Sequence, residues 1–365
     1  MASRDLYIGL MSGTSLDGVD AAVADFSQGN VRVVGHTHVP FDAALRDSLL
    51  SLSTPGIDEI DRAGRLGCVL AQHYGLAVNL VLTHSGVTAA DIRAIGCHGQ
   101  TVRHRPEQGF TVQIGNPALL AELTKIPVVA DFRSRDLAAG GQGAPLVPAF
   151  HAVAFGDPSE SRAVVNIGGI ANITLLPRGL PESGFDTGPG NCLLDLWAQR
   201  HIGKPFDRAG AWAAGARALP AMLTKMLGEP YFQLAPPKSS GRELFSPAWQ
   251  SGFLDGSEAP QAVQATLLEI TVESISRAVQ AAAPAVSRLI VCGGGAKNDA
   301  LLARLRDRLA PCIVESSAMH GLDPDQVEAM AFAWLAQRAI EGKAGNVPQV
   351  TGASGPRVLG AIYPA

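Results

Sequence analysis

Residues 9–20 read G-L-M-S-G-T-S-L-D-G-V-D, and a second glycine turn follows in residues 166–174, N-I-G-G-I-A-N-I-T. Each turn lies between two short apolar runs, which are Leu6–Met11 and Ala21–Phe26 for the first and Ala163–Ile167 and Ile170–Leu176 for the second. Apolar runs separated by glycine turns predict β-hairpins. Because the arrangement recurs, we expect two lobes built on one plan.

The rest of the chain alternates predicted strands with predicted helices. We expect strands at Val31–Val34, Ile92–Cys97, Phe110–Ile114, Ile126–Ala130, Leu289–Cys292 and Val358–Tyr363. We expect helices at Phe41–Leu52, Ile57–Leu82, Pro117–Lys125, Leu193–His201, Gln261–Ala283, Asp299–Leu309 and Asp325–Glu341. This alternation predicts an α/β fold of mixed sheets flanked by helices. Residues 133–148 break both periodicities, so we expect one lobe from 1–133 plus 342–365 and another from 134–341.

Length and charge exclude several classes of protein. At ~150 residues per domain, 365 residues favour two domains. Lys plus Arg number 29 and Asp plus Glu 33, a net charge of −4, which is not the electrostatic footprint of a nucleic-acid-binding protein. We find neither the roughly 18 consecutive apolar residues of a membrane span nor the apolar core of a signal peptide. The five scattered cysteines form no C-x-x-C pair. We therefore expect a soluble, cytoplasmic protein.

Three glycine turns are candidate sites for a phosphate-bearing ligand. The first offers the hydroxyl groups of Ser12, Thr14 and Ser15, and its glycines let the backbone approach an anion. In the second, Asn166 and Asn172 flank a Gly-Gly pair. The third, Gly293–Gly295, precedes a helix that Asn298 would cap, and a flat base or ribose could lie against its bare backbone. The first two could also be ordinary structural turns, and the competitor for the third is a dinucleotide-binding turn. A G-x-G-x-x-G fingerprint fails at Asn298, and no Walker A pattern occurs.

A carboxylate and two polar loops add candidate catalytic and binding residues. Asp186 lies in F-D-T-G-P-G-N, which we expect to be a Gly/Pro loop just before a predicted helix, and such a loop suits a general base because it fixes the carboxylate and leaves it open to a substrate or water. Asn191 suits the N-cap of that helix, which would leave Asp186 for other work. Two loops, 98–101 and 131–136, follow predicted strands, where ligand sites are common. Arg133 could hold a substrate carboxylate bidentately, or could form a buried ion pair between lobes.

In this order, the three turns resemble the two phosphate hairpins and the adenosine turn of the sugar kinase, Hsp70 and actin superfamily. Within it, M-S-G-T-S-L-D-G-V-D, C-H-G-Q-T, A-D-F-R-S-R-D, G-G-Q-G-A-P-L-V-P and F-D-T-G-P-G-N are similar to motifs of the anhydro-N-acetylmuramic acid kinase family. The resemblance extends from Tyr7 to the terminal L-G-A-I-Y-P. It implies a two-lobed, actin-like (ribonuclease H-like) ATPase fold with a central cleft, and a typically dimeric enzyme.

The resemblance also implies a reaction. The family's substrate is 1,6-anhydro-N-acetylmuramic acid, a cell-wall turnover product without a free 6-hydroxyl group. A water activated by Asp186 would attack C1, the bridge would open, and O6 would take the γ-phosphate of ATP, with Mg²⁺ as cofactor. The product would be N-acetylmuramic acid 6-phosphate. Glu328 resembles a second acidic residue near the metal or the water.

The resemblance also implies which residues would contact the nucleotide, the sugar and the metal ion. The nucleotide would contact Gly13, Thr14, Ser15, Leu16, Asp17, Gly18, Val19, Asp20, Asn166, Gly168, Gly169, Gly293, Gly294, Gly295 and Asn298. The sugar would contact Ser12, His98, Gln100, Thr101, Arg133 and Gly188. The wider superfamily usually carries an Asp where this chain has Met11, so the candidate Mg²⁺ ligands are Asp17 and Asp20.

Other functions remain open on the sequence. Another sugar kinase of the same superfamily would share all three turns. A glycoside hydrolase could use Asp186 with Glu182 or Glu328 as its carboxylate pair, although the glycine turns would then have no role. A sugar-sensing repressor would need a DNA-binding helix pair, and an actin-like chaperone would need a further domain.

Overall fold

The computed structural model describes residues 5–13, 15–29, 31–236, 238–241 and 244–365, and the chain forms two compact units. The first unit consists of 1–154 and 326–365, and the second of 155–325. These limits differ from the expected ones, because 134–154 and 326–341 belong to the first unit. The main reason is helix α12 (Val327–Ile340), which packs against strands of the first sheet.

The first unit contains a six-stranded mixed sheet in the order β13-β7-β4-β1-β2-β3. Its strands are β1 (Leu6–Met11), β2 (Gly18–Asp25), β3 (Arg32–Pro40), β4 (Ile92–Cys97), β7 (Val128–Ala130) and β13 (Ala361–Tyr363). Strands β1, β2 and β3 are antiparallel, β1, β4 and β7 are parallel, and β13 pairs antiparallel with β7. A separate hairpin joins β5 (Gln100–Arg105) to β6 (Phe110–Ile114).

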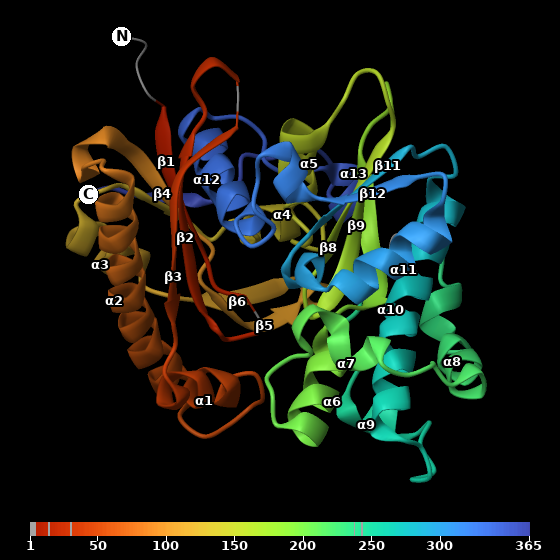
Figure 1. The fold of residues 1–365 in the computed structure, drawn as a ribbon. Coiled ribbons are helices and arrows are strands. Elements are labelled where there is room, and N and C mark those ends of the chain that lie inside the picture. Colours follow the sequence, from red (N-terminus) through yellow and green to blue (C-terminus); the bar gives the residue numbers. More distant parts are fainter. Residues whose placement is uncertain (1–4, 14, 30, 237, 242–243) are drawn as a thin grey trace. The chain divides into compact units, whose positions relative to one another are not determined.

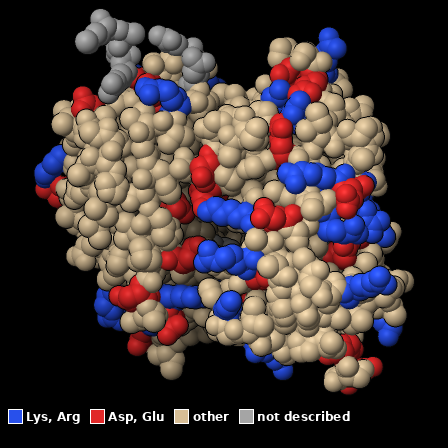
Figure 2. Space-filling view, in the orientation of Figure 1, with Lys and Arg blue, Asp and Glu red and all other residues tan. Residues whose placement is uncertain are grey.

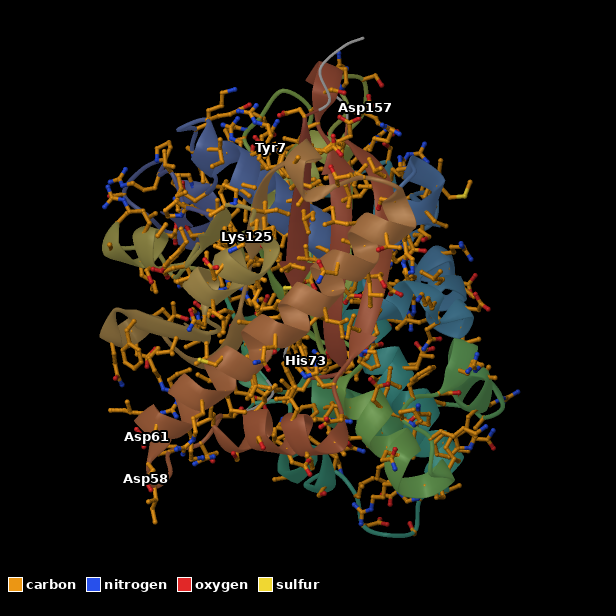
Figure 3. All side chains as sticks on the ribbon, turned by 90° about the vertical axis from the view of Figure 1, so that its left-hand side faces the viewer. Tyr7, Asp58, Asp61, His73, Lys125 and Asp157 are labelled. Carbon is orange, nitrogen blue, oxygen red and sulfur yellow. The ribbon has the colours of Figure 1, made fainter. Side chains whose placement is uncertain are left out.

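Helices cover both faces of this sheet (Figure 1). Helix α2 (Glu59–Ser85) packs on β2 and β3, and α12 lies on the other face. Figure 3 looks onto α2, with Asp58 and Asp61 at its N-terminal end and His73 farther along. Of the described helices, α2 alone has the length and composition that would suit a membrane span, but its buried residues pack against the sheet. The unit's other helices are α1 (Ala43–Ser51), α3 (Pro117–Thr124), α4 (Ser134–Ala138), α5 (Pro148–Phe155) and α13 (Pro348–Thr351).

The second unit contains a five-stranded mixed sheet in the order β10-β9-β8-β11-β12. Its strands are β8 (Arg162–Ile167), β9 (Ile170–Leu176), β10 (Ser183–Pro189), β11 (Arg288–Cys292) and β12 (Ile313–Ser316). Its helices are α6 (Cys192–Ile202), α7 (Ala211–Ala214), α8 (Pro220–Leu227), α9 (Pro247–Ser251), α10 (Pro260–Ala282) and α11 (Asp299–Leu309). Apolar side chains of the strands and of α6, α10 and α11 form one buried core.

The predicted duplication is confirmed by the order and direction of the strands. Strands β3-β2-β1-β4-β7 of the first sheet match β10-β9-β8-β11-β12 of the second, with antiparallel and parallel pairs at the same places. The match extends to sequence at the equivalent helices, since 116–123 read N-P-A-L-L-A-E-L and 298–305 read N-D-A-L-L-A-R-L. The Asn116 side chain accepts from the Leu119 N–H at 2.9 Å, and the Asn298 side chain accepts from the Leu301 N–H at 3.0 Å. Both helices therefore begin with the same cap.

The structure corrects two local expectations. The segment around Asp186 is not a loop but strand β10, and the loop after β4 runs directly into β5. Strand β10 lies at an edge of its sheet, where glycine and proline are tolerated because one side of the strand needs no ladder partner. Its Gly and Pro residues had favoured a turn in the sequence.

Candidate functional site

Two paired glycines set the position of α12 on the first sheet. Gly9 of β1 and Gly96 of β4 are register partners. A Cβ atom on Gly9 would lie 1.7 Å from the carbonyl oxygen of Ala329, and one on Gly96 would lie 2.0 Å from that of Phe332. The helix backbone therefore rests directly on the sheet. Glu328 and Phe332 are one turn apart and share a side of the helix.

Arg133 and His98 form the centre of a polar cluster in the first unit. The Arg133 Nη2 group donates to His98 Nε2 at 2.8 Å, and Nη1 donates to the carbonyl oxygen of Gly143 at 2.7 Å. Because a guanidinium group can only donate, Nε2 must accept and the ring proton lies on Nδ1. Burial, with the nearby Arg133 charge, lowers the pKa of His98 to about 3, so the ring is neutral. The Phe332 ring packs on His98 at 4.7 Å between centroids.

Glu328 joins this cluster from α12. Burial lowers the pKa of Arg133 to about 10, and the charges of Glu328 and Asp136 oppose that shift. Asp136 is fully buried, and it accepts from the Gly143 N–H at 2.8 Å. The same carboxylate therefore holds the peptide segment whose carbonyl group receives Arg133. The structure thus brings together three predicted site residues: Glu328, His98 and Arg133.

Ser12, Gln100 and Thr101 lie around the first glycine turn and the β5–β6 hairpin. The Ser12 hydroxyl lies 2.9 Å from the Tyr74 hydroxyl, and Gln100 Nε2 donates to the carbonyl oxygen of Gly13 at 3.1 Å. Gln100 Oε1 is buried without a hydrogen-bond partner among the described residues. Thr101 accepts from Gln113 across the hairpin at 3.2 Å. Ser12 and Gln100 therefore belong to the surroundings of the turn, and Thr101 to the hairpin.

A pocket of about 350 Å³ opens beside His98 within the first unit. Polar and aromatic side chains line it, among them Tyr74, Thr111, Gln113, Asn116, Asp131 and Ser134. Its volume is within the range of about 300–1,000 Å³ for ligand pockets. It is therefore a candidate receptor for part of a small molecule.

The first glycine turn combines buried anchors with exposed polar groups. Thr14 lies outside the described residues. Leu16 and Val19 are buried in the core, and Gly18 packs so tightly on β3 that a Cβ atom would lie 2.4 Å from the Val39 carbonyl oxygen. Leu16 has φ +56° and donates its N–H to the Gly13 carbonyl oxygen at 3.3 Å. The turn is thus fixed by its apolar residues, which leaves backbone and hydroxyl groups for a ligand.

The two candidate metal ligands differ in their surroundings. Asp17 is exposed and accepts from the Ser15 hydroxyl at 2.7 Å. Asp20 Oδ1 lies 3.0 Å from His38 Nδ1 and 3.3 Å from His36 Nε2, both on β3. Burial would raise the pKa of Asp20, but the bonds from the two histidines outweigh it and hold that pKa below its usual value. Within the described part of the chain, no group of three His, Cys, Asp or Glu residues is arranged to hold a metal ion.

In the second unit, the second and third glycine turns meet. A Cβ atom on Gly293 would lie 2.3 Å from Asn166 Oδ1, and one on Gly295 would lie 2.4 Å from the Ile167 side chain. Gly294 and Gly295 lie in a short 3-10 helix, Gly294–Lys297, which follows Gly293 and precedes α11. Only bare backbone fits these contacts. The structure therefore brings the predicted phosphate and adenosine turns to one place.

The loop between β10 and α6 is hydrogen-bonded to the second glycine turn. The N–H groups of Gly190 and Asn191 donate to the carbonyl oxygens of Gly169 at 3.0 Å and Gly168 at 2.8 Å. Asn191 stands at the N-cap position of α6, but its side chain does not cap the helix. Its Nδ2 group instead donates to the Ile167 carbonyl oxygen at 3.0 Å. The expected capping role of Asn191 is therefore wrong, while that of Asn298 is confirmed.

Asp186 projects from the edge strand β10 and is half-buried. Its Oδ2 atom accepts from the Ser240 N–H at 2.9 Å. Burial raises the pKa of Asp186 to about 6, against the lowering effect of that hydrogen bond. Gly188, two residues on, has φ +152° and packs against Phe232 and Ser274. It is buried and contributes to the support of the strand.

Two further residues at Asp186 were missed by the sequence analysis. The Tyr231 hydroxyl donates to the Asp186 carbonyl oxygen at 2.7 Å, and the Asp186 N–H donates to the Lys238 carbonyl oxygen at 3.1 Å. The polar run K-S-S-G, residues 238–241, indicates a loop. Nothing in that run, however, pointed to Asp186.

The sequence matches the family model for anhydro-N-acetylmuramic acid kinase over residues 5–365. The chain belongs to the anhydro-N-acetylmuramic acid kinase family. It is 54% identical over 372 residues to the anhydro-N-acetylmuramic acid kinase of Variovorax paradoxus, covering 99% of both chains. It is 52% identical over 361 residues to that of Nitrosospira multiformis, covering 98% of this chain and 99% of the relative.

Solved structures similar to this family member are more distant. An activator of 2-hydroxyisocaproyl-CoA dehydratase from Clostridium difficile, with bound ADPNP, is 11% identical with a TM-score of 0.48, covering 90% of this chain and 92% of the other. A ROK family glucokinase from Streptomyces griseus, in complex with glucose and AMPPNP, is 14% identical with a TM-score of 0.42, covering 91% and 99%.

The charged side chains of this kinase family member are mixed in sign on the surface in view. Figure 2 shows Lys and Arg interspersed with Asp and Glu on this face. Ion pairs join charged side chains of the described residues, such as Arg288 with Glu160 at 2.8 Å and Arg304 with Glu269 at 2.5 Å. This face therefore lacks an extended patch of one sign among the described residues.

Proposed function

We propose that the chain uses ATP to convert 1,6-anhydro-N-acetylmuramic acid into N-acetylmuramic acid 6-phosphate, a step of peptidoglycan recycling. The observation that carries the proposal is the family match over residues 5–365. Relatives that carry the kinase name align with this chain over nearly their whole lengths.

Asp186 is the proposed general base. A carboxylate whose pKa is about 6 is mostly ionised at neutral pH, yet accepts a proton more readily than an ordinary aspartate. It would take a proton from a water molecule as the water oxygen bonds to C1 and the bond from C1 to O6 breaks. O6 would then bond to the γ-phosphorus atom while the bond from that atom to ADP breaks. Water is thus the source of the new anomeric hydroxyl group.

Glu328, Arg133 and His98 are proposed to hold the sugar from the first unit. The substrate carries a lactyl carboxylate, and Arg133 is the buried cation of this cluster. His98 accepts from Nε and Nη2 of the guanidinium group and the Gly143 carbonyl oxygen accepts from Nη1, and these contacts fix the direction of the group. Because His98 is neutral, it adds no second positive charge. Glu328 would balance Arg133 and take part in orienting the water.

The glycine turns are proposed to hold ATP. The first turn and the paired second and third turns offer backbone N–H groups and contacts that only glycine permits. Magnesium is usually held by one or two carboxylates together with phosphate oxygens and water, which these residues fit. We assign Asp17 as its protein ligand, because the two histidines already engage Asp20. Mg²⁺ bound with ATP would neutralise charge on the β- and γ-phosphates.

We further propose that the enzyme works in the cytoplasm as a homodimer, as the family resemblance implies. Analytical ultracentrifugation of the purified chain tests the oligomeric state. A single species of monomer mass over the working concentration range would remove the dimer from the proposal.

Mass spectrometry of the product tests the reaction. The enzyme is incubated briefly with ATP, Mg²⁺ and the anhydro-sugar in ¹⁸O-labelled water, and we expect one label at C1 and phosphate at O6. Unlabelled product placed in labelled water for the same time controls for exchange at the anomeric centre. A hydrolysed sugar without phosphate would indicate a glycoside hydrolase, and phosphate elsewhere on an intact bicyclic sugar would indicate another sugar kinase.

A further inference from the structure

We infer that Tyr231 is a positioning residue for Asp186, whose backbone it clamps on the open side of the edge strand. The inference rests on the proposed role of Asp186 as the base. Tyr231 lies in a 3-10 helix, Pro230–Gln233, outside the sheet. Its hydroxyl group donates to the Asp186 carbonyl oxygen at 2.7 Å.

The need for a clamp follows from the position of β10. Strand β10 pairs with β9 on one side only, and the pairing shifts register between Asp186 and Gly188. An edge strand leaves every second N–H and C=O group without a ladder partner. At Asp186 those two groups are bound instead by the Lys238 carbonyl oxygen, at 3.1 Å, and by Tyr231. Groups outside the sheet therefore fix the peptide that carries the base.

The carboxylate is held by the same segment. Ser240, two residues after Lys238, donates its N–H to Asp186 Oδ2 at 2.9 Å. The Lys238 ammonium group lies 4.7 Å from the centre of the Tyr231 ring and donates to the Tyr231 carbonyl oxygen at 3.2 Å. Tyr231 thus touches Asp186 directly and also holds the segment that binds its carboxylate.

Tyr231 is well suited to act only as a fixed donor. Its side chain is buried, and burial, with the neighbouring Asp186 charge, raises its pKa well above the usual value. Its ring packs edge-on against Phe245 at 5.6 Å and against Phe232 at 5.9 Å between centroids. Phe232 in turn supports Gly188 on the far side of the register shift. Tyr231 therefore contacts β10 at Asp186, and Phe232 contacts it at Gly188, on the two sides of the register shift.

Tyr231→Phe tests the inference, because it keeps the ring and removes only the hydroxyl group. We expect kcat to fall about tenfold, the value of one hydrogen bond, with KM for ATP unchanged. Looser packing would admit water to Asp186 and lower its pKa, so the acid limb of the pH profile should move to lower pH. The titratable groups beside Asp186 in this clamp are Tyr231 and Lys238.

Trp249→Phe is the matched control. Trp249 packs on Phe245 in the same aromatic group, at 5.2 Å, and its indole N–H donates to Glu229 at 2.8 Å. It should lower Tm comparably without moving kcat or the acid limb. If Tyr231→Phe likewise lowers Tm but leaves kcat and the acid limb unchanged, Tyr231 is merely structural and the inference is overturned.

Two further variants separate the possible failures. Asp186→Asn is assayed in parallel; if it retains turnover, the proposed role of the base fails whatever Tyr231 does. If Tyr231→Phe does not fold, Ser240→Pro removes the N–H donor from the carboxylate and should move the acid limb to higher pH, because that bond lowers the pKa of Asp186. An unmoved limb in Ser240→Pro would overturn the clamp.

Discussion

Gly9 lies directly beneath Ala329, so that a methyl group at position 9 would approach the Ala329 carbonyl oxygen to 1.7 Å. Contact this close leaves the helix one position on the sheet. Because Glu328 precedes Ala329 on this helix, the same contact fixes the location of the Glu328 backbone. Helix–sheet packing in the core thus sets where a proposed active-site carboxylate stands.

Gly9→Ala should destabilise the protein by about 3 kcal/mol, because the helix backbone must move away from the sheet. The free energy of unfolding from urea titration measures this. Gly64→Ala, on the exposed side of α2 with nothing within 4 Å of its Cβ position, is the control and should be stabilising by about 0.5–1 kcal/mol. Equal effects of the two variants would contradict the close packing.

Asp186→Asn should lower turnover by about a thousandfold or more, because the base is lost while the shape of the side chain is kept. ATP affinity, measured by titration calorimetry with a non-hydrolysable analogue, should stay nearly unchanged. Glu182→Gln is the matched control on the preceding segment and should retain activity. Loss of activity in Glu182→Gln instead would favour the carboxylate pair of a hydrolase.

The raised pKa of Asp186 should also make the stability of the protein depend on pH. Its pKa is about 6 in the folded chain, against 3.8 for an unperturbed aspartate, so the folded state holds this proton more tightly. The stabilising contribution is complete below pH 4 and is lost as pH rises through 6. The neutral amide of Asp186→Asn does not ionise, so this variant does not lose stability as the pH rises. At pH 8 its free energy of unfolding should exceed that of the wild type by about 1–2 kcal/mol, a figure reduced because Asp186 is partly exposed to solvent. At pH 5 the gain should shrink; a gain independent of pH would mean that burial does not raise this pKa.

His98→Ala should raise KM for the sugar about tenfold, because Arg133 loses the acceptor that directs it. KM for ATP should not change. The neutral state of His98 predicts no titration step near pH 6.5 from this residue. His84→Ala, at the exposed end of α2, is the control in steady-state kinetics. An unchanged sugar KM in His98→Ala would remove His98 from recognition of the sugar.

Much of the fold was accessible from the sequence because its signals are local. Apolar runs broken by glycine turns identified both hairpins, and Asn298 marked the start of α11. The assignment of 326–341 to the second lobe followed chain order and differs from the structure. What places α12 on the first sheet is the contact of Gly9 and Gly96 with its backbone, and two lone glycines in strands give no sign of their partner.

The candidate site was accessible only in part, for a related reason. Asp186 stood out because it lies in a Gly/Pro segment just before a predicted helix, and Arg133 because its loop follows a predicted strand. Tyr231 and Ser240 did not, because their contacts cross 45 and 54 residues of chain and involve backbone groups, which carry no sequence signal. The sequence also could not reveal that β10 is an edge strand that needs such partners.

The two N-x-A-L-L-A-x-L segments bear on how the two halves came to differ. Both follow a parallel strand and open a helix with the same asparagine, yet a bare glycine turn precedes one and the whole β5–β6 hairpin precedes the other. If an ancestral half-molecule was copied once, this junction is one of the places where the two copies came to differ. New specificity could then arise by altering one connection, while the inherited framework on either side stayed intact.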